Sequence, residues 1–246
     1  MESTETRSAI VTGASRGIGR AIAERLAKDG LAVVVNYAGG EAEARALVKQ
    51  IDSDGGRAVA VQGDVSKSND IARLFDTAEK EFGGADVLVN NAGIMTLSPI
   101  ASADDAAFDR MIAVNLKGTF NGVREAAKRL RNGGRIINFS TSVVGLRLEN
   151  YGIYAATKSA VETLTAILAN ELRGRSITVN AVAPGPTATD LFLNGKSPEL
   201  IDRMARMNPL ERLGTPQDIA AAVSFLAGPD GSWINGQVIR ANGGMV

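Results

Sequence analysis

The sequence contains neither cysteine nor histidine. Without cysteine there can be no disulfide, no thiolate-bound metal and no cysteine nucleophile. Without histidine there can be no Ser-His-Asp triad, no imidazole-bound zinc and none of the usual general bases near neutral pH. Acid–base chemistry in this chain must therefore come from Tyr, Lys, Asp or Glu side chains, and we expect no metal site.

The sequence also lacks an excess of either charge and any long apolar run. Lys and Arg together number 27, as do Asp and Glu, so the formal net charge is zero. This balance gives no indication of binding to nucleic acid or to a membrane surface. No apolar run approaches the ~20 residues that span a bilayer, and residues 1–8 lack the basic start and apolar core of a signal peptide. We expect a cytoplasmic protein with no nucleic-acid or membrane partner.

Short β-branched runs alternate with longer segments whose apolar residues recur every three or four positions. The predicted strands are residues 9–12, 32–36, 58–62, 87–90, 135–140, 178–182 and 237–240. This alternation is typical of a parallel sheet with helices on both faces and right-handed crossovers, which is a doubly wound Rossmann-type α/β fold. We expect residues 1–246 to form a single domain. Residues 186–209 are irregular and rich in proline, and we predict that they form a substrate lid.

The first predicted strand leads directly into the segment TGASRGIG, residues 12–19, and a helix follows. Glycines at Gly13, Gly17 and Gly19 would allow a tight turn and a close approach of the backbone to a pyrophosphate at the helix N-terminus. A glycine triplet by itself is a weak signal, because an ordinary strand-to-helix turn also uses glycine. The strand before it and the helix after it favour dinucleotide binding.

Tyr154 and Lys158 are four residues apart and would share one face of a helix. An amphipathic pattern that we expect to pack on the sheet continues with Ala160, Val161, Leu164, Ile167 and Leu168. An ammonium about 4 Å from the phenol would favour phenolate by up to ~4 kcal/mol at an effective dielectric of about 20. That would lower the pKa of Tyr154 by roughly 3 from its reference of ~10. Most Tyr and Lys residues at this spacing are simply surface neighbours, but a phenol with such a pKa could act as a general acid or base.

Together these motifs resemble the short-chain dehydrogenase/reductase family, and in particular its members that resemble 3-oxoacyl-(acyl carrier protein) reductases. The similarity spans about residues 8 to 244. After TGASRGIG the matching segments are Asp64-Val65, Asn90-Asn91-Ala92-Gly93, Asn115, Tyr154 with Lys158, Pro184-Gly185, Arg212-Leu213-Gly214 and Gly243-Gly244. The resemblance implies an oxidoreductase that interconverts a carbonyl and a secondary alcohol by hydride transfer from a nicotinamide cofactor. It also implies a homotetramer or homodimer.

The resemblance further implies a catalytic set of Asn115, Ser142, Tyr154 and Lys158, with Tyr154 as general acid in carbonyl reduction and as general base in alcohol oxidation. In the family a Ser hydrogen-bonds the reacting oxygen, and an Asn holds a water molecule in a proton relay. Two cues disagree about the hydroxyl, because the downstream Gly145 selects Ser142 whereas the usual spacing to Tyr154 selects Thr141. We favour Ser142, since the following loop could absorb a one-residue deletion. Thr141 remains the alternative, and at least one neighbouring hydroxyl is expected to cap backbone groups.

NAD-preferring members of the family carry an acid at the end of the second strand. Here that place is taken by Asn36, Tyr37 and Ala38, and the first acid, Glu41, comes later. Arg16 in the glycine turn could reach a 2′-phosphate, so the predicted cofactor is NADP(H). The predicted cofactor-binding residues are Gly13, Ser15, Arg16, Gly17, Ile18, Gly19, Asn36, Tyr37, Ala38, Asp64, Val65, Asn91, Ala92, Gly93, Tyr154, Lys158, Pro184, Gly185, Thr187 and Thr189.

The sequence is less specific about the substrate, which we expect to be a small ketone or a 3-oxoacyl compound. Arg147 could meet an anionic substrate or simply be solvated. The apolar residues that could form the substrate pocket or belong to the core are Met95, Leu97, Val144, Leu146, Phe192 and Leu193. Two other classes of protein are compatible with these motifs: a non-catalytic NADP(H)-binding sensor on the same fold, and a nucleotide-sugar epimerase, which is usually longer.

Overall fold

The computed structural model describes residues 6–246, so most of the polar segment 1–8 lies outside the described residues. The strands are β1 (Ser8–Val11), β2 (Ala32–Tyr37), β3 (Ala58–Gln62), β4 (Ala85–Asn90), β5 (Leu130–Phe139), β6 (Thr178–Pro184) and β7 (Val238–Ala241). They form one sheet in the order β3-β2-β1-β4-β5-β6-β7, and every neighbouring pair is parallel. All seven predicted strands are confirmed. The largest difference from prediction is at β5, which begins at Leu130 and not at residue 135. Its first half pairs with β4 only at Leu130, and a register shift separates this pair from the regular pairing that starts at Arg135.

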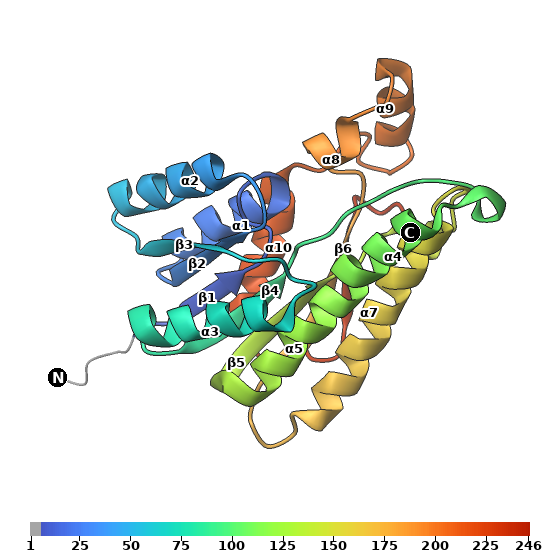
Figure 1. The fold of residues 1–246 in the computed structure, drawn as a ribbon. Coiled ribbons are helices and arrows are strands. Elements are labelled where there is room, and N and C mark those ends of the chain that lie inside the picture. The colour runs from blue at the N-terminus through green and yellow to red at the C-terminus, as the bar shows by residue number, and fades with distance from the viewer. Residues whose placement is uncertain (1–5) are drawn as a thin grey trace.

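Helices cover both faces of this sheet, which confirms the Rossmann-type fold (Figure 1). One face is covered by α1 (Gly17–Lys28), α2 (Glu41–Ser53) and α10 (Pro216–Ala227), and the other by α3 (Ser68–Phe82), α5 (Gly118–Arg129) and α7 (Gly152–Glu171). The pleat of β1 explains the division, because Ala9 and Val11 pack toward α1 while Ile10 packs toward α3. Each fully buried Ile or Val stabilises the fold by about 1.5–3 kcal/mol.

Helix α7 packs on the sheet through a different stripe from the one predicted. Val161 and Leu168 are buried as expected, but Ile167 is 50% exposed and faces away from the sheet. The position facing the sheet is taken by Thr165, whose hydroxyl accepts a hydrogen bond from Asn138 of β5 at 2.9 Å. A buried polar residue with a partner thus replaces an apolar one, which the hydrophobic pattern could not reveal.

The loops that follow β1 and β4 meet at the point where the strand order reverses, which is where such sheets bind ligands. The remaining elements lie around this edge: η1 (Ile100–Ser102), α4 (Asp105–Met111), the π-helix η2 (Ile112–Lys117), α6 (Val143–Leu146), α8 (Asp190–Leu193) and α9 (Pro198–Ala205). Residues 186–209, which were predicted to be irregular, contain the two short helices α8 and α9. Helix α9 projects beyond the body of the protein (Figure 1). None of the helices within residues 6–246 has the length and apolar character needed to cross a membrane.

Candidate active site

A cavity of about 560 Å³ lies at the carboxyl edge of the sheet, a size typical of small-molecule sites. All the predicted cofactor-binding residues line it, from Gly13 in the first loop to Thr189 before α8. Tyr154, Lys158, Thr141 and Ser142 line it as well. The structure therefore brings together residues that are far apart in the sequence. Within residues 6–246 there is no group of three or more side chains placed to hold a metal ion.

The glycine turn is held in place by the loop after β4. Asn91 donates from its side-chain amide to the carbonyls of Thr12 and Gly13 at 2.9 and 3.1 Å. The main-chain N–H groups of Asn91 and Ala92 both donate to the Thr12 hydroxyl at 3.1 Å. At Gly19 a Cβ would lie 2.3 Å from the Gly13 carbonyl oxygen, so only glycine fits there.

This turn presents the N-terminus of α1 to the cavity. Gly13 and Gly17 have φ of +63° and +56°, which favours glycine at both positions. Among the described residues, no side chain caps the first turn of α1, so its main-chain N–H groups remain available. Free N–H groups and the positive end of the helix dipole suit a pyrophosphate, and the residues present fit a dinucleotide.

At the other end of the glycine turn, the Asn36 side chain connects the turn to the end of β3. Its side chain accepts from the Gly13 N–H at 3.2 Å and donates to the carbonyls of Val61 and Gly63 at 3.3 and 3.0 Å. The residue is only 1% exposed. The Asn36 amide therefore forms its hydrogen bonds within the protein, although Asn36 lines the cavity as predicted.

Asp64 lies in the same part of the cavity wall and remains ionised. Although burial raises the pKa of Asp64, hydrogen bonds from Ser66 and the nearby charge of Arg110 outweigh this, so the pKa lies below its usual value. The Ser66 hydroxyl and main-chain N–H donate to Asp64 at 2.7 and 3.0 Å. The second carboxylate oxygen of Asp64 lies 3.6 Å from Arg110.

Two charged side chains of opposite sign line the cavity near the end of β2. Arg16 is exposed at the start of α1, and its side chain has no ion-pair or hydrogen-bond partner among residues 6–246. Glu43, which the sequence analysis missed, lies on the first turn of α2, with its carboxylate 3.1 Å from where a Cβ on Gly40 would be. Glu41 instead pairs with Arg45 at 2.7 Å. The position of Glu43 in the first helical turn after Gly40 was the available signal.

Tyr154 and Lys158 are close together, but their electrostatics differ from the prediction. Burial raises the pKa of Tyr154 to about 12, against a lowering effect of its hydrogen bond with Thr141. Burial lowers the pKa of Lys158 to about 8. The Lys158 ammonium donates to the carbonyl of Phe139 at 2.8 Å and lies 6.0 Å from the centre of the Tyr154 ring. The predicted fall in the Tyr154 pKa is thus wrong for this arrangement, because desolvation outweighs an ammonium that is held by another group.

The three hydroxyls after β5 have three different partners. Ser140 donates to Glu162, and Thr141 hydrogen-bonds with Tyr154. Ser142 is 2% exposed; its hydroxyl donates to the carbonyl of Ala183 at 3.3 Å and accepts from Asn242 at 2.9 Å. The geometry therefore favours the alternative, Thr141, over Ser142 as the hydroxyl beside the phenol. The physical reason is that Ser142, directly before α6, directs its hydroxyl to the Ala183 carbonyl of β6.

Asn115 lies beneath the cavity and does not line it. It is fully buried in the π-helix η2, where its side chain exchanges two hydrogen bonds of 2.9 Å with the main chain of Ile94. Its amide also donates to Thr157 of α7 at 3.3 Å. The side chain thus joins the loop after β4 to α7. Short π-helical segments within an α-helix, such as η2, are frequent at functional sites.

The apolar part of the cavity agrees only in part with the prediction. Met95, Leu146 and Phe192 line it, whereas Leu97, Val144 and Leu193 do not. Arg147 is exposed at φ +54° and lies outside the lining. Lining residues that the sequence did not indicate include Leu148, Tyr151, Leu191, Met204, Met207 and Met245. No local pattern marks these positions, because they come from segments that only the fold brings together.

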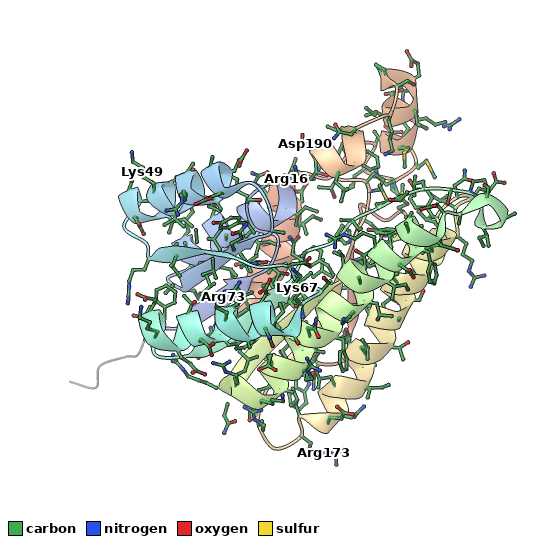
Figure 2. All side chains as sticks on the ribbon, in the orientation of Figure 1. Arg16, Lys49, Lys67, Arg73, Arg173 and Asp190 are labelled. Carbon is green, nitrogen blue, oxygen red and sulfur yellow. The ribbon has the colours of Figure 1, made fainter. Side chains whose placement is uncertain are left out.

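Residues 186–209 form the outer side of the cavity. Thr189 accepts a hydrogen bond from the N–H of Phe192 at the start of α8, and its methyl lies 3.5 Å from where a Cβ on Gly17 would be. Arg16 and Asp190, at the starts of α1 and α8, both line the cavity and are labelled in Figure 2. The segment therefore touches the glycine turn at its first helix.

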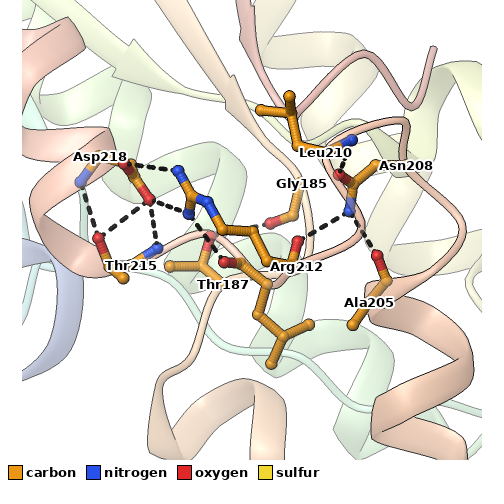
Figure 3. A network of polar contacts seen from close by, with 9 residues as sticks. Gly185, Thr187, Ala205, Asn208, Leu210, Arg212, Thr215 and Asp218 are labelled. Carbon is orange, nitrogen blue, oxygen red and sulfur yellow. Dashed lines mark hydrogen bonds and ion pairs between the residues drawn. The ribbon is translucent and has the colours of Figure 1, made fainter.

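The far end of this segment is anchored by a polar network around Asn208 (Figure 3). The Asn208 amide donates to the carbonyls of Ala205 and Arg212, both at 2.8 Å. Arg212 in turn pairs with Asp218 at 2.7 Å, and Asp218 forms a reciprocal cap with Thr215 at the start of α10. The segment is thus tied firmly to α10 where it rejoins the body of the fold.

Comparison with known proteins gives close relatives over nearly the whole chain. Residues 13–246 match the family model described as enoyl-(acyl carrier protein) reductase. A short-chain type dehydrogenase/reductase of Picea abies is 48% identical, covering 98% of this chain and 92% of its own. The chloroplastic NADPH-dependent aldehyde reductase 2 of Arabidopsis thaliana is 46% identical, covering 97% and 93%. The structure of the angucycline C-6 ketoreductase LanV with bound NADP superimposes with a TM-score of 0.92 at 38% identity, covering 97% and 95%.

The raised pKa of Tyr154, about 12, predicts that this phenol stays protonated in the ligand-free protein up to about pH 10. Ultraviolet absorbance of phenolate, followed while the pH is raised, measures this directly. The difference between the native protein and Tyr154→Phe isolates Tyr154 from the other two tyrosines. A phenolate signal from Tyr154 that develops between pH 7 and 9 would contradict the geometry described here.

Proposed function

This chain belongs to the short-chain dehydrogenase/reductase family, and we propose that it is an NADPH-dependent reductase of carbonyl compounds with Tyr154 as the proton donor. The observation that carries the proposal is the contact between the Tyr154 phenol and the Thr141 hydroxyl in the wall of the cavity, with Lys158 beneath. The related proteins that bear functional names are reductases. None of them supports the alternative of a non-catalytic sensor.

NADPH would supply the hydride, and the residues of the glycine turn, with Asp64 and Thr189 further along the cavity, would hold the cofactor. The chain itself provides the proton. Tyr154 carries its proton at physiological pH, since its pKa lies far above neutrality, and it would donate this proton to the carbonyl oxygen. Thr141 would donate a hydrogen bond to the same oxygen and hold it in place. Below about pH 8 Lys158 keeps its charge and would stabilise the phenolate left behind.

Asn115 and Phe139 would act by positioning. Phe139 holds the Lys158 ammonium through its carbonyl at 2.8 Å. Asn115 fixes α7, the helix that carries Tyr154 and Lys158, through its bond to Thr157. The substrate would occupy the apolar part of the cavity, where carbon and sulfur atoms of Met95, Leu146 and Phe192 favour an uncharged group. We propose a small ketone or a 3-oxoacyl compound as its carbonyl substrate.

We further propose that residues 186–209 close over the bound cofactor and substrate as a lid. Two contacts support this role. Thr189 lies next to Gly17 at one end of the segment, and hydrogen bonds of Asn208 fix the other end. The lid and its C-terminal flank carry large apolar side chains that are exposed in this state, namely Leu191, Met207 and Leu210. Closure would remove such groups from water and exclude water from the reacting carbonyl.

We also propose that the protein is a homotetramer or homodimer. Phe108, Phe120 and Ile167 are each more than 40% exposed on α4, α5 and α7, which lie side by side in Figure 1. Trp233 is 96% exposed in the loop before β7, and Phe225 of α10 is 44% exposed. Exposed apolar groups of this size on neighbouring helices are typical of an association surface.

Replacing Tyr154 by Phe should lower kcat by ~10²–10⁴ while leaving NADPH binding nearly unchanged, because only the acidic proton is removed. Steady-state turnover with a panel of carbonyl compounds and NADPH binding by fluorescence measure the two effects. Tyr151→Phe is the matched control, since Tyr151 packs edge-on against Tyr154 with ring centres 6.5 Å apart but has no assigned proton. A Tyr154→Phe protein with near-native kcat would overturn the proposed function.

Thr141→Val should reduce kcat more than Ser142→Ala does. Valine keeps the shape of threonine but removes the hydrogen bond to Tyr154 and to the reacting oxygen, whereas Ser142 is engaged by Ala183 and Asn242. Removing one donor to a reacting oxygen costs about 10²–10³ in kcat. Single-turnover rates at saturating NADPH compare the two variants, and the reverse order would return the role to Ser142.

Arg16→Ala should weaken NADPH binding by about 10-fold and hardly change NADH binding. A charge-assisted bond to a 2′-phosphate is worth roughly 1.5–3 kcal/mol, and solvent at this exposed side chain brings the value to the lower end. Arg20→Ala is the matched control on the same helix, since Arg20 pairs with Glu24 at 2.9 Å. Equal losses for both cofactors with Arg16→Ala would show that Arg16 only supports the turn.

Glu43→Gln should tighten NADPH binding, because it removes a negative charge near the expected position of the 2′-phosphate.

A further inference from the structure

Residues 242–246 follow β7 and form part of the cavity wall. Met245 lines the cavity together with Met204 and Met207 of the neighbouring lid segment and Met95 of the loop after β4. The side chains that share this apolar part of the lining carry no charge; they include Leu146, Leu148, Tyr151 and Phe192. A methionine side chain is unbranched and polarisable, so it adapts to bulky apolar groups and favours contact with aromatic rings.

Asn242 attaches these residues to the loop that carries Thr141. Asn242 is 8% exposed, and its amide donates to the Ser142 hydroxyl at 2.9 Å and to the carbonyl of Val246 at 3.2 Å. Its oxygen accepts from the N–H groups of Gly244 and Met245 at 3.0 and 3.3 Å. One side chain thus shapes the turn that presents Met245 and fixes this turn to the residue next to Thr141.

The same turn also packs against the end of the lid segment. Gly243 and Gly244 have φ of +69° and +87°. A Cβ on Gly243 would lie 2.5 Å from the side-chain oxygen of Asn208, and one on Gly244 would lie 3.3 Å from Pro209. On the other side, Val246 lies 2.7 Å from where a Cβ on Gly145 would be. Residues 242–246 are therefore wedged between the loop after β5 and the anchored end of the lid.

We propose that residues 242–246 belong to the substrate site, with Met245 as a specificity-determining residue for the size of the apolar group on an uncharged carbonyl substrate. Asn242 is a positioning residue that acts through Ser142. This inference rests on the proposed reductase function and extends it. It also assigns Ser142 a task, because its hydroxyl anchors the wall of the site while its neighbour Thr141 faces the reacting oxygen.

The first test measures kcat/KM for a bulky ketone, 2-acetylnaphthalene, and a small one, 2-butanone. Met245→Ala removes contacts with the bulky substrate only, so the ratio of the two values should fall about 10-fold. Met245→Trp narrows the cavity and should lower the ratio by at least as much. A ratio that stays within twofold of the native value in both variants would overturn the role of Met245.

A binding measurement separates this inference from the proposed function. The dissociation constant of 2-naphthol for the protein loaded with NADP⁺, measured by calorimetry, requires no turnover. Met245→Ala should weaken this binding about 10-fold, while the affinity for NADP⁺ is the internal control for folding. If the native protein reduces no carbonyl compound, the proposed function fails, but the binding comparison still decides whether Met245 forms the site. Unchanged binding of 2-naphthol in Met245→Ala would overturn the inference by itself.

The second test is a double-mutant cycle between Asn242→Ala and Ser142→Ala. Alanine at position 242 removes the amide that donates to Ser142 and to Val246. Each single variant should raise KM for 2-acetylnaphthalene at least about fivefold, the equivalent of one hydrogen bond, with a smaller effect on kcat. The double variant should be little worse than Asn242→Ala alone, because both substitutions break the same link. Asn170→Ala, which removes an exposed amide on α7, is the matched control. Additive effects, or a loss confined to kcat, would show that Asn242 does not act through Ser142.

Discussion

The hydrogen bonds between the loops after β1 and β4 are the constraint on which the site depends. Asn91 and the Thr12 hydroxyl join two strands whose helices leave on opposite faces of the sheet. This clamp leaves no space for a side chain at Gly19, and it fixes the open N-terminus of α1 at the edge of the cavity. The position of this one turn therefore determines where the free main-chain N–H groups of α1 face the cavity and where residues 186–209 meet the turn.

Burial, more than charge pairing, determines the pKa values of the two ionisable groups at the centre of the site. Desolvation raises the pKa of the Tyr154 phenol to about 12 and lowers that of the Lys158 ammonium to about 8. At neutral pH the phenol therefore keeps its proton, and most of the ammonium keeps its charge in spite of burial. The contacts of Lys158 with Phe139 and of Asn115 with Ile94 keep these groups in place.

The strands and the glycine turn could be predicted from the sequence, because they are local patterns, and all seven strands were found this way. Most of the other predicted cofactor-binding residues came from the resemblance to a known family, and all of them line the cavity. Contacts between distant segments could not be predicted. The orientation of the Ser142 hydroxyl depends on Asn242, which is one hundred residues further along the chain. That Glu43 lines the cavity depends on how α2 packs on the sheet. Ile167 is exposed because Thr165, bonded to the buried Asn138, takes the position that faces the sheet.

Sulfur is unevenly distributed in this protein, and that gives the site a natural reporter. The sequence has six methionines and no cysteine. Of the five methionines within residues 6–246, Met111 is buried in the core, and the other four, Met95, Met204, Met207 and Met245, line the cavity. Isotopic labelling of methionine methyl groups would therefore place most of the resulting magnetic-resonance signals around the ligand. They come from the loop after β4, from residues 186–209 and from the residues after β7, so one spectrum would follow three walls of the cavity separately.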